Sequence, residues 1–184
     1  MTHQEQTEYL DPYDPEFEAL ECLELIPVPE DTPLNSNEWI SVNNNSKLKL
    51  KEILHRAARC FTKKFNYGPA YEYSYRNSEE YSAALFIDGS NIIGGCAIHY
   101  NYKNVPDLHG LQWVWLHPDY RRSGVFKRFW NDYVKELDSI AIESPISVDM
   151  IAFIENFIIE NDQWTYLNET VDPELCIILE QKNR

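Results

Sequence analysis

Two arginines, a glycine and a lysine stand together in the run RRSGVFK, residues 121–127. An apolar, strand-like stretch ends just before it at Pro118, and a helical pattern begins directly after Gly124. The first N–H groups of a helix have no intrahelical acceptor, and the helix dipole favours an anion there. Glycine lets an anion approach the backbone, while Arg121 and Arg122 can add charge-assisted hydrogen bonds. The run therefore predicts a cradle for a pyrophosphate group.

Phe126 is the residue of this run that fits a phosphate-binding turn least well, because such a turn favours a small side chain. Two interpretations remain open. Phe126 shares an apolar helical stripe with Trp130, Tyr133 and Leu137, so its side chain can point into the core and leave its N–H group for the phosphate. Alternatively, the ring blocks the cradle and no cofactor binds.

Leu116-His117-Pro118 followed by residues 121–126 resembles the signature of the GNAT superfamily of N-acetyltransferases. In that signature, an apolar strand ending V-x-P precedes Q/R-x-x-G-x-G/A and a helix. The resemblance implies acetyl-CoA, or another acyl-CoA, as cofactor, and transfer of its acetyl group to a primary amine. It also implies that the strand edge holds the pantetheine arm. The cofactor-binding residues implied are Val114, Leu116, Arg121, Arg122, Ser123, Gly124, Val125, Phe126 and Lys127.

The resemblance also implies a proton acceptor and a proton donor, but the residue types common in the family are missing here. The motif strand GLQWVW, residues 110–115, holds no glutamate, and the later helix at 152–158 holds no tyrosine. His109, His99 and Asp149 are the substitute bases, and Tyr166 is the substitute acid.

The elements that must position these residues follow from periodicity and turn signals. Helical spacing predicts helices over 46–65, with Ser46 as cap, and over 121–137 and 152–161. Residues 81–88 and 92–102 predict a hairpin with Asp88-Gly89 in its turn. Further strands are expected over 17–28, 111–116, 145–150, 164–171 and 174–181. This order predicts one α/β domain with a mixed sheet packed with helices. The resemblance implies the GNAT-like form of it, a mixed, mostly antiparallel sheet flanked by helices.

Charge is unevenly distributed along this acidic chain, whose formal net charge is -14. Residues 1–45 hold 11 acids and no base, whereas residues 46–65 hold seven bases against Glu52. A broad basic face for nucleic acid is thus not expected. The acidic segment could lie against the basic helix, attract a cationic substrate, or serve mainly solubility.

Length and composition predict a flexible acidic N-terminal arm, residues 1–16, followed by one domain, residues 17–184. The resemblance implies that this is a GNAT-like acyltransferase domain. No apolar stretch approaches the roughly 20 residues that a membrane span needs, and the N-terminus does not resemble a signal peptide. The four cysteines are widely spaced, which favours buried, reduced thiols and a cytoplasmic location.

The acceptor implied is an amine: a protein lysine, an N-terminus or a small cationic amine. A tyrosine-rich segment with carboxylates also suits a cationic amine or a lysine side chain. Its residues are Tyr67, Tyr71, Tyr73 and Tyr75, with Glu72, Glu79 and Glu80. Three functions remain in view. The first is an acetyl-CoA-dependent N-acyltransferase, and the second is a catalytically degenerate GNAT-fold interaction protein that uses its acidic arm. The third, an acidic mimic of nucleic acid, rests on charge alone.

Overall fold

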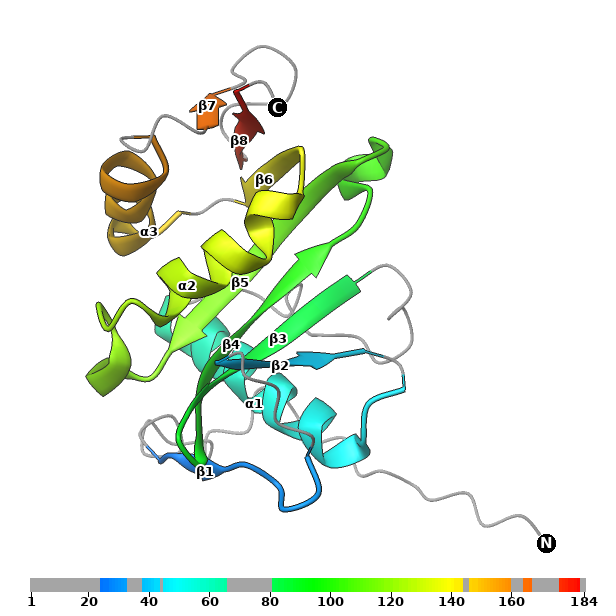
Figure 1. Ribbon diagram of the computed structural model, residues 1–184, viewed down its shortest axis with the longest axis vertical. Coiled ribbons are helices and arrows are strands. Elements are labelled where there is room, and N and C mark those ends of the chain that lie inside the picture. Colours follow the sequence, from blue (N-terminus) through cyan, green and yellow to red (C-terminus); the bar gives the residue numbers. More distant parts are fainter. Residues whose placement is uncertain are drawn as a thin grey trace, which may run out of the picture.

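A computed structural model of the chain describes residues 24–32, 38–43, 45–65, 81–143, 146–159, 164–166 and 176–182. Its strands form one eight-stranded sheet in the order β2-β3-β4-β5-β6-β8-β7, with β1 paired to β4 (Figure 1). Only β5 and β6 run parallel; the other strand pairs described are antiparallel. The mixed, mostly antiparallel sheet is as the sequence predicts.

The strands are β1 (Ile26–Pro27), β2 (Trp39–Val42), β3 (Tyr81–Asp88), β4 (Asn91–His99), β5 (Leu108–Leu116), β6 (Ser139–Glu143), β7 (Trp164–Tyr166) and β8 (Cys176–Gln181). The α-helices are α1 (Leu48–Phe65), α2 (Val125–Asp132) and α3 (Val148–Phe153). Single 3₁₀ turns form η3 (Tyr102–Asn104), η4 (Pro118–Tyr120) and η5 (Val134–Glu136), and a π-helix, η6 (Ile154–Ile159), continues α3.

Both faces of the central strands are covered, which explains why β3 and β4 are almost continuously apolar. On β3, Ala83 and Leu85 pack in the cluster that includes α1. Ala84 and Phe86 point the other way, into the cluster with α2 and η6. Helix α1 therefore lies on one face of the sheet and α2 on the other, as Figure 1 shows.

The hairpin of β3 and β4 confirms the predicted turn. Asp88 pairs with Asn91, so Gly89 and Ser90 form a two-residue loop. Gly89 has φ 57°, a left-handed backbone that glycine adopts without steric cost. The predicted helix over 46–65 is also present as α1, but Ser46 does not cap it. Its hydroxyl accepts a hydrogen bond from the Asn43 N–H group instead (3.0 Å).

Strands β5 and β6 pair over only part of their length, which opens the sheet. Their parallel register runs from Leu108↔Ser139 to Leu111↔Ile142. Beyond Leu111, β5 continues to Leu116 while β6 ends at Glu143. The β5 edge after Leu111 therefore faces a gap in the sheet instead of a neighbouring strand, within the ranges that the structure describes.

Several predicted elements need correction. The strand expected over 145–150 is wrong for its described part, 146–150: Ser147 caps α3, and its hydroxyl accepts a hydrogen bond from the Met150 N–H group (3.1 Å). The strand before α3 is β6, to which the sequence analysis assigned nothing, and β2 was missed in the same way. The helix expected over 121–137 is shorter, because α2 ends at Asp132 and η5 follows it.

Some predictions lie outside the described residues, including the arm over 1–16 and the tyrosine-rich segment. Of the cysteines, Cys96 and Cys176 are free and buried, as expected. Cys60 is disulfide-bonded, so the expectation of reduced thiols is wrong for that residue. Among the described helices, none is both long and apolar enough to cross a membrane.

Candidate active site

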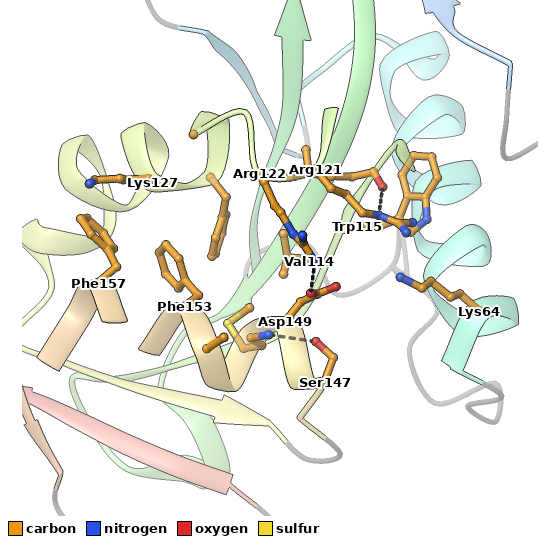
Figure 2. A pocket seen from close by; sticks show the side chains of 15 residues that line it. Lys64, Val114, Trp115, Arg121, Arg122, Lys127, Ser147, Asp149, Phe153 and Phe157 are labelled. Atoms are coloured by element: carbon orange, nitrogen blue, oxygen red, sulfur yellow. Dashed lines mark hydrogen bonds and ion pairs between the residues drawn. The ribbon is translucent and has the colours of Figure 1, made fainter. Parts of the chain in front are cut away.

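A cleft of about 490 Å³ opens where β5, the turn before α2, and α3 meet. Its floor is apolar and includes Val114, Met150 and Phe153, while four cations line it: Lys64, Arg121, Arg122 and Lys127. Figure 2 shows these side chains reaching the cleft from α1, the turn and α2. A cleft with an apolar floor and a cationic rim suits a ligand that is apolar at one end and anionic at the other.

The turn that forms one wall depends on Gly124, the N-cap of α2, whose φ of 85° lies in the left-handed region. A Cβ atom at this position would also lie 3.2 Å from Nη1 of Arg128. Arg128 N–H is the first of the helix to bond back, to Gly124 O at 3.0 Å. The preceding N–H groups of α2 therefore have no acceptor within the helix, and the helix end that carries them borders the cleft.

The two arginines of the turn have different settings. Arg121 is partly buried and donates from Nε to the carbonyl of Leu116 at 3.1 Å, which ties the turn to the end of β5. Arg122 is 90% exposed, has φ 63°, and lies 3.8 Å through Nη2 from Oδ1 of Asp149 on α3. That ion pair spans the cleft (Figure 2). Arg121 is thus held in place, and Arg122 keeps the freedom of a surface side chain.

Lys127 and Lys64 complete the cationic lining. Nζ of Lys127 lies 4.4 Å from the ring centre of Phe157. The pKa of Lys64 is lowered by burial and by the nearby charge of Arg121, and raised in part by Asp149. Lys64 was not singled out from the sequence, because only the fold brings the end of α1 to the turn before α2.

Phe126 fills the core and also borders the cleft. It is 8% exposed and packs against Phe86, Trp130 and Phe153, with ring-centre distances of 6.1, 6.0 and 5.0 Å. The ring therefore points away from the helix axis into the aromatic core, as the first of the two interpretations expects. The other two residues of the run do not line the cleft: Ser123 donates to Tyr120 O (2.6 Å), and Val125 is buried.

A comparison with models of protein families shows the family of the chain. The model of the acetyltransferase (GNAT) family matches residues 50–148. The chain belongs to this family.

Known structures agree on the GNAT fold. A GNAT-family acetyltransferase from Staphylococcus aureus Mu50 shares a TM-score of 0.53 and 13% identity, covering 78% of this chain and 99% of that one. For an acetyltransferase from Thermus thermophilus the TM-score is 0.51 at 12% identity, with 79% and 97% covered. Identities this low show a shared fold alone. No curated protein sequence matches the chain.

For a GNAT acetyltransferase, the predicted bases and acid are scattered. Nδ1 of His109 lies 3.0 Å from the carbonyl of Asp107, at the opposite end of β5 from the cleft. His99 stacks on Tyr81 at 4.6 Å. Neither histidine lines the cleft.

The other two predicted residues also differ in their setting. Tyr166 is 38% exposed on β7, and burial together with Glu155 raises its pKa. It does not reach the cleft, whereas Asp149 does. Asp149 is therefore the only predicted base that the fold brings to the cleft, and there it faces Arg122.

Glu143 is a residue that the sequence analysis missed. It ends β6 next to the point where β5 and β6 part, and it lines a small cavity of about 30 Å³. That cavity shares Val114, Ser147 and Met150 with the cleft. In sequence, Glu143 belongs to a strand that was not predicted, so only the pairing of β5 with β6 could have drawn attention to it.

Proposed function

We propose that the chain is an acetyl-CoA-dependent N-acyltransferase that moves an acetyl group onto a primary amine. A protein lysine, an N-terminus or a small cationic amine remain the candidate acceptors. The observation that carries the proposal is the cleft itself. In a chain of net charge -14, four cations and one carboxylate gather around an apolar floor. A compound with anionic phosphates and an uncharged acyl arm matches that distribution of charge.

Residues 121–127 would hold the pyrophosphate. The N–H groups at the start of α2 offer hydrogen bonds, and the constrained Gly124 turn leaves room for the anion. Arg121 would add a charge-assisted hydrogen bond from a side chain already anchored to Leu116. Lys64 faces the same space from α1, as a further cation that the sequence motif does not include.

The exposed edge of β5 would hold the pantetheine arm. From Gln112 to Leu116, β5 faces the gap where β6 has ended, within the described ranges. Backbone groups on that side can therefore bond an extended ligand, except the Leu116 carbonyl, which accepts from Arg121. This edge spans about 13 Å at the usual rise per strand residue. It leads from the turn before α2 toward the point where β5 and β6 separate. Acetyl-CoA supplies the activated acyl group, and the protein orients it for attack by the amine.

Calorimetric titration with acetyl-CoA tests the binding step. The wild-type chain should bind, and Arg121→Glu and Gly124→Asp should weaken binding at least about tenfold, since each removes or opposes a charge-assisted contact. Lys135→Glu makes the same reversal of charge on η5, away from the cleft, and should bind as the wild type does. A wild-type chain that does not bind acetyl-CoA would contradict the proposal.

Labelled acetyl-CoA tests the transfer step. The chain is incubated with spermidine, lysine, peptides bearing a free N-terminus or a lysine, and a cell lysate. Incorporation of label above background, abolished by Gly124→Asp, is the expected result. Binding without transfer to any amine would instead support the alternative: a catalytically degenerate interaction protein that uses its acidic arm.

A further inference from the structure

Glu143 lies at the vertex of the gap in the sheet, which is the point where β5 and β6 begin to separate. The last pair between β5 and β6 joins Leu111 to Ile142, and Glu143 is the next residue along β6. Opposite it, β5 bulges: the register with β4 moves from Ile98↔Leu111 to Ala97↔Trp113, so Gln112 is the extra residue. The edge of β5 that faces the cleft ends at this vertex. An acyl group carried inward along that edge therefore arrives beside Glu143.

The two carboxylate oxygens of Glu143 have different partners. Oε1 accepts a hydrogen bond from the Tyr102 hydroxyl at 3.2 Å. Oε2 is shielded from solvent and has no hydrogen-bond partner within the described part of the chain. A buried carboxylate oxygen with no donor is costly, so such a group calls for a ligand, a proton or a water molecule. The adjoining cavity of about 30 Å³ is large enough for one water.

The charges around Glu143 leave it a usable base. Burial raises the pKa of Glu143, and the Tyr102 hydrogen bond with the charges of Lys103 and His99 offsets part of that rise. The thiol of Cys176 faces it from β8, in register. The elements that line the small cavity from α1 and α3 contribute Phe61 and Met150, neither of which is charged. A carboxylate whose pKa is raised accepts a proton more effectively than an ordinary carboxylate.

We propose that Glu143 is the proton acceptor for the amine, and that Tyr102 positions its carboxylate; the proposal rests on the acyl transfer proposed above. An ammonium group gives one proton to the carboxylate, directly or through a water in the small cavity. The nitrogen lone pair then forms the N–C bond with the thioester carbonyl carbon. The C–S bond breaks with its electron pair on sulfur, and the second proton lost from nitrogen reaches that sulfur. Glu143 finally returns its proton to solvent.

This assignment differs from the bases expected from the sequence by its place in the fold. Asp149 is exposed and faces Arg122, so its carboxylate is already compensated by an arginine. His109 lies at the other end of β5. Among the three bases expected from the sequence and Glu143, only Glu143 combines a shielded oxygen with a place at the small cavity, whose lining shares residues with that of the cleft.

Glu143→Gln, assayed with the most reactive amine of the panel above, is the central test. It keeps the size of the side chain but removes the base, so kcat/KM should fall about 100-fold or more. The Kd for acetyl-CoA should stay within about twofold, because the phosphate cradle is untouched. Glu180→Gln makes the same change at an exposed position of β8 and should leave kcat/KM unchanged. A Glu143→Gln chain that keeps kcat/KM within about threefold overturns the proposal.

The pH profile separates a chemical role from a structural one. In the wild type, log kcat/KM should rise with pH as Glu143 loses its proton. Tyr102→Phe removes a hydrogen bond that favours the carboxylate, so the pKa of Glu143 rises and this limb should move to higher pH. An unmoved limb overturns the proposal even where Glu143→Gln fails to fold. A wild type that binds acetyl-CoA but transfers to no amine overturns the proposed function, and the role of Glu143 with it.

Discussion

Single residues of the turn before α2 differ in what they contribute: one sets the backbone conformation, and two carry positive charges with different partners. Gly124 supplies a left-handed φ that an L side chain adopts at a cost, and Arg121 is fixed by the carbonyl of Leu116. Arg122 instead pairs with Asp149 across the cleft, at the surface. These residues are close together in sequence, but Gly124 and Arg121 are held in place, whereas Arg122 is exposed and its charge is already paired with that of Asp149.

Gly124→Ala should reduce both stability and affinity. A Cβ atom at φ 85° costs about 1–2 kcal/mol, and the contact with Arg128 adds to it. Because the turn must shift to relieve this strain, the Kd for acetyl-CoA should rise at least about fivefold. Gly89→Ala is the matched control: φ is also positive, at 57°, but the position is open and does not line the cleft. It should lose similar stability in urea unfolding and keep its affinity in calorimetry.

Asp149→Asn tests whether Asp149 is only the ion-pair partner of Arg122 or acts as the proton acceptor. An exposed ion pair contributes about 0.2–1 kcal/mol, so releasing Arg122 for a phosphate should tighten acetyl-CoA binding by up to about fivefold. The rate of transfer at saturating acetyl-CoA should not change, and Asp132→Asn on the exposed side of α2 should alter neither quantity. A large fall in rate with unchanged affinity would assign the base to Asp149 instead.

At the scale of elements, α2 connects the cleft to the core. Its first residues belong to the proposed phosphate cradle, and its inner side places Phe126, Phe129 and Trp130 against the sheet. Arg128 also pairs with Glu38 at the start of β2, which anchors the helix to a strand 90 residues earlier in the chain. The orientation of the cradle therefore depends on packing between α2 and the sheet, as well as on the motif.

Phe126→Ala tests whether the ring supports the cradle or obstructs it. Removing a buried phenyl group should cost about 3–5 kcal/mol in urea unfolding. Under conditions in which the variant stays folded, the Kd for acetyl-CoA should remain within about threefold, because the N–H groups of α2 are still present. Phe129→Ala, which empties the core without bordering the cleft, serves as the control. Tightening of more than about tenfold in Phe126→Ala alone would show that the ring obstructs binding.

At the scale of the whole molecule, one sheet carries both the stability and the site. Helices on its two faces bury the central strands, while the parallel pair β5 and β6 separates to form the cleft. Non-covalent contacts between distant elements hold this arrangement. The Tyr133 hydroxyl, after α2, donates to Oγ of Ser82 on β3 at 2.8 Å, and the Tyr133 ring stacks on Phe129 at 5.3 Å.

Tyr133 should make the fold sensitive to alkaline pH. Burial raises its pKa to about 12, against about 10 for tyrosine in an unfolded chain. The stability that the neutral phenol contributes is thus complete below pH 10 and is lost as pH rises from 10 through 12. Urea unfolding at about pH 8 and about pH 11 measures this loss. Tyr133→Phe should be about 1 kcal/mol less stable at the lower pH and decline less by the higher one. An equal decline in both chains would contradict the assignment.

Local patterns in the sequence determined much of this protein. The hairpin at Asp88-Gly89, helix α1, and the order strand, turn, helix around Gly124 all depend on neighbours along the chain, so periodicity and turn chemistry could predict them. Short β6 could not be predicted, because its five residues carry too few alternations to tell a strand from a loop. The tertiary structure alone decided which distant residues meet. Local sequence does not encode that α1 brings Lys64 to the cleft, or that Glu143 lies at the small cavity where β5 separates from β6.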